Sequence, residues 1–332
     1  MQFVLAVTYH TYNQKRLLTN EKHKTTGRFS QSSAATRIGT NTTDLMTRGK
    51  EMECRLDRIT IHYEVRGEGR PLLALHGWPL DHRAMVGAFE PIFAKRQGWK
   101  RIYPDLPGMG KTKGPEWLTT QDQMLDTLIE FLERVIPGKR FSVAGLSYGG
   151  LLAQGLVHRL ADRMDGLFLL VPSMGPEETR DLPPHCVLHM EPTGFDGVDE
   201  ENITGFRNMA VVQTQQHLEA WKRDIIPGVK AADGKFLGRL RKDYAFSFDI
   251  AALTEPFTKP TLFLHGRQDN VCGYRDAWKV FESYPRATYA VLDRAGHCLQ
   301  LEQRALFEAL TNEWLDRVDE AARMQATHMR EQ

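Results

Sequence analysis

From about residue 52 onward, short apolar segments alternate along the chain with longer segments of mixed character. Residues 53–57 and 59–65 alternate apolar and polar side chains, which is typical of two paired antiparallel strands. Residues 71–77 (PLLALHG) form a continuous apolar run, as expected of a strand that is buried on both faces. Residues 81–97 then carry apolar side chains at helical spacing, which predicts an amphipathic helix.

The same alternation recurs further along the chain. Further strands are predicted at residues 100–107, 139–145, 164–173, 261–266 and 287–293, and further helices at residues 119–135, 148–161, 274–284 and 299–322. Strands and helices of these lengths in alternation imply βαβ units. The pattern therefore predicts an α/β fold with a mostly parallel sheet that is flanked by helices.

Between residues 174 and 255 the alternation stops. A proline-rich loop at residues 176–186 precedes a broadly helical stretch at residues 199–245. The simplest interpretation is a helical cap inserted between two strands of one sheet, and such insertions commonly cover the carboxyl ends of the strands, where ligands bind. We therefore expect a core of residues 51–173 and 256–325 with a cap at 174–255. Residues 1–50 are polar and predict a disordered or loosely attached arm.

Composition narrows the partners that the chain is expected to have. Of 332 residues, 43 are Lys or Arg and 42 are Asp or Glu, so the formal charge is +1. This balance gives no long-range attraction to nucleic acid, and a small uncharged or weakly charged substrate is favoured. The sequence contains no apolar run of the roughly 20 residues that a membrane span needs. The opening MQFVLAV lacks a basic stretch before it, so we expect a cytoplasmic protein. Its oligomeric state is not predicted.

The four cysteines (Cys54, Cys186, Cys272 and Cys298) show no C-x-x-C spacing. They predict neither a zinc site nor a dense disulfide framework, and reduced thiols are the favoured interpretation. A disulfide or redox-sensitive pair between Cys272 and Cys298 remains open, because both lie beside the candidate residues described next.

Gly145-Leu146-Ser147-Tyr148-Gly149 follows one predicted strand and opens a helix. That context is typical of a nucleophile elbow, in which a sharp, strained turn lifts the serine hydroxyl above the edge of the sheet. Glycines on either side allow the neighbouring backbone to approach closely. The alternative is an ordinary Gly-rich turn with an incidental serine.

A serine hydroxyl is a weak nucleophile unless a base removes its proton. His297 follows the last predicted strand and Asp269 follows the strand before it, so both belong to the edge of the sheet where Ser147 is expected. A carboxylate at 269 can hold the imidazole and stabilise its protonated form. Asp269 could instead cap the next helix. Asp293 and Glu302 are alternative acids, but both lie too near His297 along the chain to face its ring easily.

Trp78 and Tyr148 are the candidate oxyanion-hole and substrate-binding residues. An oxyanion needs two preorganised N–H donors, and Tyr148, directly after the serine, offers one of them. Trp78 in HGWP lies just past a strand end and offers the other, whereas Pro79 has no N–H to donate. The Trp78 ring either lines the pocket or packs against the insertion.

The motifs HGWP, PDLPGMGKT, GLSYGG, HGRQD and RAGH, in that order, resemble those of the α/β-hydrolase superfamily over roughly residues 51–318. The resemblance implies an eight-stranded α/β-hydrolase sheet with a helical cap, a Ser147–His297–Asp269 triad, and chemistry that needs no cofactor or metal. It also implies that GMGKT belongs to the D-x-x-G-x-G-x-[ST] turn at the floor of the site. The full phosphate-binding loop would need a glycine in place of Asp105.

These features predict a serine hydrolase that cleaves a carboxylic ester, or a related acyl bond, through an acyl-enzyme. We expect its partner to be a small, apolar acyl compound. Relatives that resemble haloalkane dehalogenases and epoxide hydrolases use an aspartate where this chain has Ser147. Proline-iminopeptidase relatives carry Trp where it has Tyr148. Aminopeptidase-like, carbon–carbon bond, lactone and cofactor-free haloperoxidase-like activities remain alternatives. A non-enzymatic alternative is a ligand-binding receptor or partner module on the same scaffold.

Overall fold

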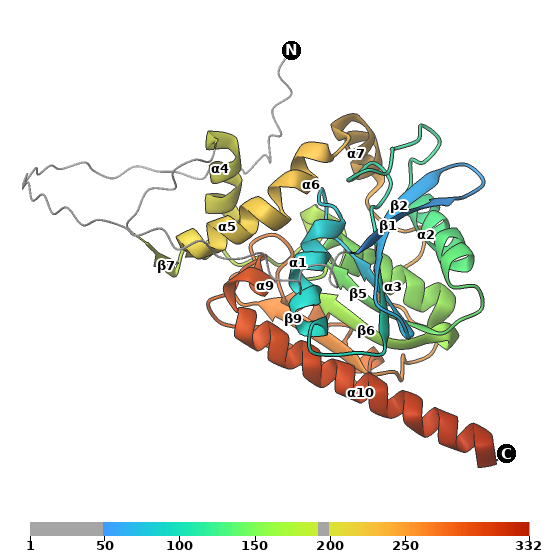
Figure 1. Ribbon diagram of the computed structural model, residues 1–332. Helices are drawn as coiled ribbons and strands as arrows, with labels where there is room; N and C mark the ends of the chain where they lie inside the picture. Colours follow the sequence, from blue (N-terminus) through green and yellow to red (C-terminus); the bar gives the residue numbers. More distant parts are fainter. Residues whose placement is uncertain (1–48, 192–198, 332) are drawn as a thin grey trace, which may run out of the picture. The chain divides into compact units, whose positions relative to one another are not determined.

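The computed structural model of the protein describes residues 49–191 and 199–331 (Figure 1). Eight strands form one sheet in the order β1-β2-β4-β3-β5-β6-β9-β10. These strands are β1 (Lys50–Arg55), β2 (Thr60–Arg66), β3 (Arg70–Leu75), β4 (Trp99–Pro104), β5 (Phe141–Leu146), β6 (Met164–Leu170), β9 (Thr261–Gly266) and β10 (Ala287–Leu292). Strand β2 is antiparallel to both of its neighbours, and the other pairs are parallel. The predicted α/β fold with a mostly parallel eight-stranded sheet is confirmed.

Helices follow most of the parallel strands, and several more fill the long segment between β6 and β9. The helices of the described residues are α1 (His82–Phe93), α2 (Gln121–Val135), α3 (Tyr148–Leu160), α4 (Glu200–Met209), α5 (Gln215–Asp224), α6 (Ile226–Ala231), α7 (Gly234–Leu240), α8 (Arg275–Trp278), α9 (Leu299–Glu302) and α10 (Arg304–Glu331). Short 3-10 turns lie at η2 (Ala161–Arg163), η3 (Glu177–Thr179), η4 (Arg241–Asp243) and η5 (Phe281–Ser283). Strands β7 (His189–Met190) and β8 (Val212–Gln213) form a separate parallel pair.

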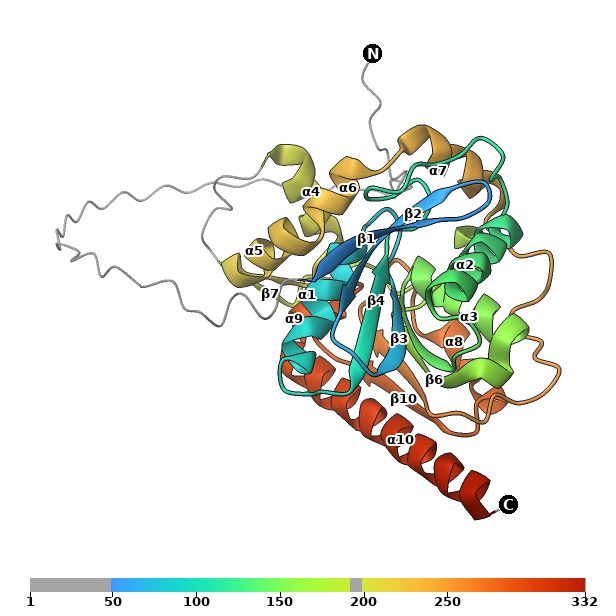
Figure 2. The ribbon, with the colours of Figure 1, turned by 45° about the vertical axis from the view of Figure 1, so that its right-hand side comes forward.

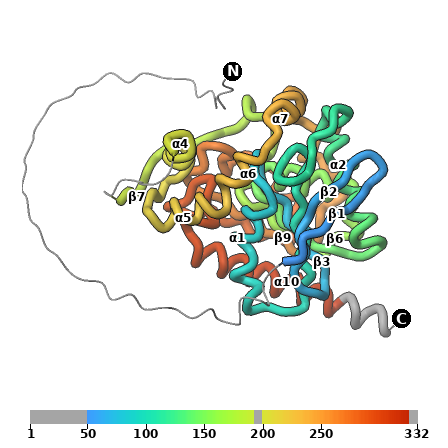
Figure 3. The backbone as a smooth tube through the Cα atoms, turned by 45° about the horizontal axis from the view of Figure 1, so that its top comes forward, coloured from blue at the N-terminus to red at the C-terminus, as the bar shows by residue number. Residues whose placement is uncertain are grey.

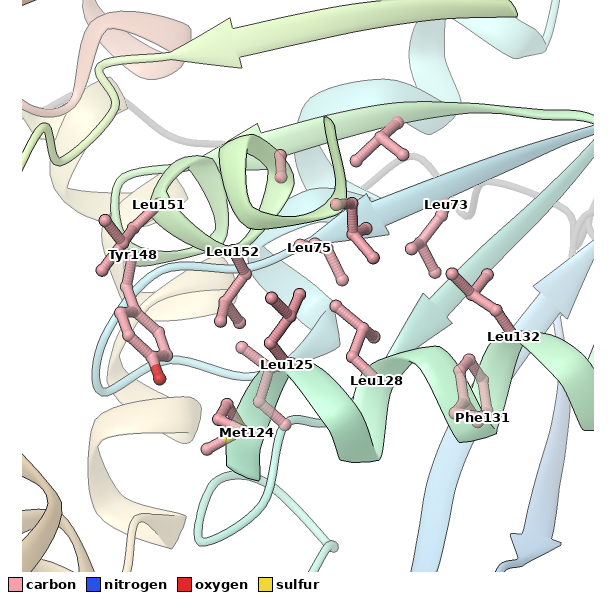
Figure 4. Close-up of a cluster of buried hydrophobic side chains, with 14 of the residues drawn as sticks. Leu73, Leu75, Met124, Leu125, Leu128, Phe131, Leu132, Tyr148, Leu151 and Leu152 are labelled. Atoms are coloured by element: carbon pink, nitrogen blue, oxygen red, sulfur yellow. The ribbon is translucent and has the colours of Figure 1, made fainter. Parts of the chain in front are cut away.

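The sheet is buried on both faces because successive side chains of a strand point to opposite sides. On β3, Leu73 and Leu75 belong to one hydrophobic cluster, with residues of α2 and α3, as Figure 4 shows. Leu72 and Ala74 belong to a second cluster, with residues of α1 and α10. Helices α2 and α3 therefore cover one face and α1 and α10 cover the other (Figure 2). This explains why the central strands have continuous apolar runs.

Strand β3 is the point at which the order of the sheet reverses. Its neighbours are β4, the next strand along the chain, on one side and β5 on the other. The chain leaves the carboxyl ends of β3 and β5 toward opposite faces of the sheet, because α1 packs on one face and α3 on the other. The loops that follow these two strands carry HGWP and GLSYGG. Strands β6, β9 and β10 continue in the same direction, so their carboxyl ends lie at this edge too.

Helices α4 to α7 lie in the segment that the sequence predicts as a cap. Helices α5 and α6 contact α1, and α5 also contacts α9, so the segment packs against the loops that follow the strands (Figure 3). The segment is helical as expected. Its extent as a separate cap, residues 174–255, stays a prediction.

Two helices and one boundary differ from the sequence predictions. The helix expected at 274–284 is only the four-residue α8 followed by the 3-10 turn η5. The helix expected at 299–322 is interrupted at Gln303, whose backbone (φ −123°, ψ 50°) is not helical, and it continues as α10. The predicted arm at 1–50 falls mainly outside the described residues, but Lys50 already belongs to β1.

None of the helices in the described part of the chain combines the length and the apolar character that crossing a bilayer requires.

Asp105, at the carboxyl end of β4, holds several loops together from a fully buried position. Its carboxylate oxygens accept hydrogen bonds from Nδ1 of His62 (3.0 Å) and Nδ1 of His82 (2.8 Å). They also accept from the backbone N–H groups of His82 and Lys111, both at 2.9 Å. Burial raises the pKa of Asp105, but the His82 hydrogen bond and charge outweigh it and hold that pKa below its usual range. Through the Lys111 N–H, the backbone of the GMGKT turn is thus hydrogen-bonded to the buried carboxylate of Asp105.

The Lys111 amino group, which a phosphate-binding loop would aim at its nucleotide, instead bonds Glu51 at 2.7 Å. Among the described residues, His62, His82 and Asp105 are the only three whose ligand atoms lie close enough together to hold a metal ion. Both oxygens of Asp105 are occupied by protein donors. The cluster therefore fits a structural hydrogen-bond network, and no metal is needed to account for it.

We expect Asp105→Asn to lower the free energy of unfolding by about 3 kcal/mol, because the amide cannot replace a buried charge that several donors share. Urea denaturation measures the loss. Asp57→Asn, at an exposed ion pair with Arg134, is the control and should leave the free energy nearly unchanged. Equal stability of both variants would contradict a structural role for Asp105.

Candidate active site

Ser147 occupies a strained turn between β5 and α3. Its backbone lies at φ 54° and ψ −111°, a region that residues with a side chain rarely adopt. The turn is held by hydrogen bonds: Ser147 N–H donates to Leu170 O (2.9 Å), and Ser147 O accepts from the N–H groups of Gly150 (2.9 Å) and Ser173 (3.0 Å). Neighbouring β6 therefore fixes this conformation from the side.

The two glycines of the GLSYG motif are required by close backbone approach. A Cβ at Gly145 would lie 2.3 Å from Gly149 O, and a Cβ at Gly149 would lie 2.3 Å from Leu75 O. Both distances are far below van der Waals contact, and backbone atoms cannot move aside as a flexible side chain could. The motif thus allows α3 to start directly against β3 and β5.

The structure brings the side chains of Ser147, His297 and Asp269 together. Nε2 of His297 lies 3.0 Å from Ser147 Oγ, and its Nδ1 lies 3.0 Å and 3.2 Å from the two oxygens of Asp269. Ser147 follows β5, Asp269 follows β9 and His297 follows β10, so the common edge of a parallel sheet accounts for their meeting. The arrangement can pass a proton from the hydroxyl to the imidazole and hold the resulting charge against the carboxylate.

Asp269 is fully buried, and its own turn supports its charge. Its Oδ1 accepts hydrogen bonds from the backbone N–H groups of Val271 and Cys272, each at 2.9 Å. Burial raises the pKa of Asp269, but the adjacent His297 and these donors outweigh it and lower that pKa below its usual value. The acid is therefore ionised at neutral pH and available to the imidazole.

Both alternative acids lie elsewhere. Asp293 is exposed, and its carboxylate accepts a 3.4 Å hydrogen bond from Gln268. Glu302 is 8% exposed and binds backbone rather than the ring of His297: its oxygens accept from the N–H groups of Gly296 (2.6 Å), Val211 (2.7 Å) and Val212 (3.3 Å). Glu302 therefore connects the loop that carries His297 to strand β8 of the inserted segment. This role was not apparent from the sequence.

Trp78 and Tyr148 flank the serine. A Cβ at Gly77 would lie 3.2 Å from Ser147 Cβ, so the HGWP loop passes directly beside the serine. Within the described part of the chain, neither the Trp78 nor the Tyr148 N–H has a hydrogen-bond acceptor. The Trp78 ring contacts Tyr148, with ring centres 5.2 Å apart, and also Tyr244 of the inserted segment, at 6.2 Å. The Trp78 ring thus contacts both the residue that follows the serine and the inserted segment.

Three further residues at the site were not identified from the sequence. Cys272 Sγ lies 3.8 Å from Ser147 Oγ, and its position three residues after Asp269 was the one available signal. Tyr244 and Arg180 belong to the segment between β6 and β9, where no sequence pattern predicts which side chains turn toward the core. All four cysteines are free, so the alternative of a disulfide between Cys272 and Cys298 is not realised. Burial raises the pKa of the Cys272 thiol to about 12, so it is neutral.

We expect the buried carboxyl of Glu302 to make stability depend on pH. Burial raises its pKa from the ordinary 4.5 to about 7, despite the three N–H donors. Because the fold disfavours the ionised form, stability is highest below pH 4.5 and falls as the pH rises toward and through 7, by roughly 3 kcal/mol. Glu302→Gln should remove this decline, which denaturation across pH 4.5–8 would measure.

Glu320→Gln, at an exposed position on α10, provides the control and should retain the pH dependence of the unaltered protein. If the unaltered protein and Glu302→Gln had parallel stability–pH profiles, the Glu302 carboxylate would not be the group responsible.

Comparisons with known proteins identify related hydrolases. A family model described as "Alpha/beta hydrolase family" matches residues 72–310. The chain is 25% identical over 275 residues to "Pimeloyl-[acyl-carrier protein] methyl ester esterase" of Legionella pneumophila (strain Paris), covering 77% of this chain and all of that protein. It is 22% identical over 275 residues to "2-hydroxy-6-oxo-6-(2'-aminophenyl)hexa-2,4-dienoic acid hydrolase" of Metapseudomonas resinovorans, covering 78% and 88% of the two chains.

Among solved structures, the chain is similar to an alpha/beta superfamily hydrolase from Oenococcus oeni PSU-1. The identity is 32% and the TM-score is 0.76, and the match covers 81% of this chain and 99% of that one.

Proposed function

Because the chain belongs to the α/β hydrolase family, we propose that it is a serine hydrolase that cleaves a carboxylic ester through an acyl-enzyme. The observation that carries the proposal is the continuous hydrogen-bonded row from Ser147 Oγ through the imidazole of His297 to the buried carboxylate of Asp269. A hydroxyl linked in this way to a base and an acid is suited to nucleophilic attack on an acyl carbon.

In the proposed first half-reaction, Ser147 Oγ bonds to the acyl carbon while His297 Nε2 takes the hydroxyl proton. Asp269 keeps the proton on Nδ1 and stabilises the imidazolium. The N–H groups of Trp78 and Tyr148 donate to the oxyanion. His297 then gives its proton to the departing alkoxide, so that an alcohol leaves and the acyl-enzyme remains.

In the second half-reaction, His297 removes a proton from water, whose oxygen attacks the acyl carbon. Collapse of that intermediate returns the proton to Ser147 and releases the carboxylic acid. Only side chains of this protein, its backbone N–H groups and water take part. The reaction as proposed therefore requires no cofactor or metal.

An ester is the favoured substrate for two reasons. The Legionella relative is named as a methyl ester esterase. The rings of Trp78, Tyr148 and Tyr244 also lie beside the serine and suit an apolar acyl group better than a peptide. The named activity of the Metapseudomonas relative keeps carbon–carbon bond hydrolysis as a second candidate. Comparing kcat/KM on four substrate classes separates the alternatives. p-Nitrophenyl esters test ester hydrolysis, p-nitroanilides test aminopeptidase-like activity, lactones test lactone hydrolysis, and vinylogous diketone acids test carbon–carbon bond hydrolysis.

We expect Ser147→Ala to abolish ester hydrolysis and labelling by a fluorophosphonate probe, because the Ser147 hydroxyl is the nucleophile that is hydrogen-bonded to the His297 base. Ser247→Ala, at an exposed serine that bonds only Asp122, should keep both properties. Thermal melting confirms that each variant is folded. A Ser147→Ala variant that still turned over ester would refute the proposal. An unaltered protein that neither reacted with the probe nor hydrolysed any ester would favour a binding module.

We expect Asp269→Asn to lower kcat by about 10³–10⁴-fold, because an amide leaves the imidazole in the wrong tautomer and its positive charge uncompensated. Steady-state kinetics on p-nitrophenyl butyrate measures the effect. The matched change at the rejected acid, Asp293→Asn, should leave kcat within about twofold. If the two variants were equally active, Asp269 would not be the acid that supports His297.

A further inference from the structure

Arg180, just after η3, holds its guanidinium between the loops that follow β6 and β9. Nε donates to Gly175 O (3.1 Å), Nη1 to Val271 O (3.0 Å), and Nη2 to Ser173 Oγ and Gly175 O, both at 2.9 Å. These bonds use four of the five N–H groups of a guanidinium, and the neutral hydroxyl of Tyr244 also interacts with the guanidinium. The side chain is therefore fixed in position by neutral partners.

Each of these acceptors is neutral, so none of them balances the charge of Arg180. Among the residues that the structure describes, no carboxylate lies within ion-pair distance of this guanidinium. The titratable groups that act on it electrostatically are the Cys272 thiol, the Tyr244 hydroxyl and the Glu177 carboxylate. The first two are neutral, and Glu177 forms its ion pair with Arg241. Removing a cation from water without a partner costs free energy, so a half-buried, unbalanced guanidinium calls for a functional explanation.

The guanidinium lies close to the nucleophile. Ser173, whose hydroxyl it binds, donates its N–H to Ser147 O at 3.0 Å. Val271, whose carbonyl it binds, precedes Cys272, whose sulfur is 3.8 Å from Ser147 Oγ. Arg180 is thus linked to the serine through two loops: through Ser173 in the loop after β6, and through Val271 and Cys272 in the loop after β9.

Aromatic rings line the same region. The guanidinium carbon of Arg180 lies 5.6 Å from the ring centre of Tyr244. That ring is in turn 5.7 Å from Tyr148 and 6.2 Å from Trp78. Burial raises the pKa of Tyr244 to about 12, so its hydroxyl is neutral and adds no compensating charge. A fixed cation beside a row of rings is complementary to a ligand that has an apolar body and one anionic group.

We propose that Arg180 is a substrate-binding residue that recognises an anionic group, such as a carboxylate, on the ester that Ser147 attacks. This inference rests on the proposed esterase function and adds a substrate class to it: a monoanionic ester rather than a neutral one. A carboxylate would accept a guanidinium N–H in place of the neutral Tyr244 hydroxyl and balance the charge at short range, where little water screens the interaction.

The alternative is that Arg180 only ties the two loops together. Such a clamp would support the nucleophile turn for every substrate alike. A role in recognition instead changes the ratio of kcat/KM between a charged and a neutral ester. The two roles therefore differ in a quantity that can be measured.

The test compares mono-p-nitrophenyl adipate, which carries a carboxylate on the acyl side, with p-nitrophenyl hexanoate, which has the same carbon number and no charge. A second pair, 4-carboxyphenyl hexanoate and 4-acetylphenyl hexanoate, places the charge on the alcohol side. Each rate is corrected for spontaneous hydrolysis. The variants are Arg180→Gln, which removes the charge, and Arg180→Lys, which keeps it. Arg239→Gln, at an exposed arginine of α7, removes a charge from the same part of the chain as the control.

We expect Arg180→Gln to lower kcat/KM for the charged member of one pair by about 10- to 100-fold, with at most a threefold change for its neutral partner. Arg180→Lys should retain part of the preference, and Arg239→Gln all of it. The pair that responds identifies the side of the ester that bears the anion. An equal loss on charged and neutral esters, or no loss on either, would overturn the proposal.

Binding separates failure of this inference from failure of the proposed function. Calorimetry with adipate and with hexanamide on Ser147→Ala protein requires no turnover. Adipate should bind at least tenfold more tightly than hexanamide, more weakly at high salt, and without this preference in the Ser147→Ala/Arg180→Gln double variant. If adipate bound more tightly than hexanamide but the unaltered protein hydrolysed no ester, only the esterase proposal would be refuted. Hydrolysis without any adipate preference, and without a selective loss for the charged member of either ester pair in Arg180→Gln, would refute the anion site alone.

Discussion

The hydrogen bond between Ser147 Oγ and His297 Nε2 joins residues that are 150 positions apart, and most features of the site serve to make it possible. It requires that the carboxyl ends of β5, β9 and β10 lie at one edge of the sheet. Parallel pairing imposes this, because every strand from β3 to β10 in the sheet runs in the same direction. Apolar side chains on both faces then fix the strands between two layers of helices, so the three loops cannot drift apart.

The conformation of each loop is stabilised by groups outside the row of three side chains. The positive φ of Ser147 is retained because β6 and Ser173 hydrogen-bond to its backbone. The buried charge of Asp269 is retained because the N–H groups of its own turn solvate it. The loop of His297 is tied to β8 by Glu302. Strain and buried charge near the site are thus balanced by hydrogen bonds from neighbouring elements.

The segment between β6 and β9 contributes to the site in two ways. Through Val211 and Val212 it binds the same carboxylate that holds the loop of His297, so the position of the imidazole depends on this segment as well as on the sheet. Through Tyr244 and Arg180 it adds an apolar ring and a fixed cation beside the serine. The sheet therefore places the three side chains of the proposed triad, while under our proposal the inserted segment selects the substrate.

The sequence by itself determined the α/β fold, the eight-stranded sheet and the three side chains at the edge, because these depend on local pattern. A buried parallel strand has a continuous apolar run, and a tight strand-to-helix turn needs glycines at fixed positions, as at Gly145 and Gly149. Helix ends were less certain, as at Gln303, because tertiary contacts override propensity there. Only the tertiary structure showed which groups Glu302, Cys272 and Arg180 contact. Their partners lie on other elements, and no periodicity in a sequence encodes which distant backbone groups a side chain will meet once the chain has folded.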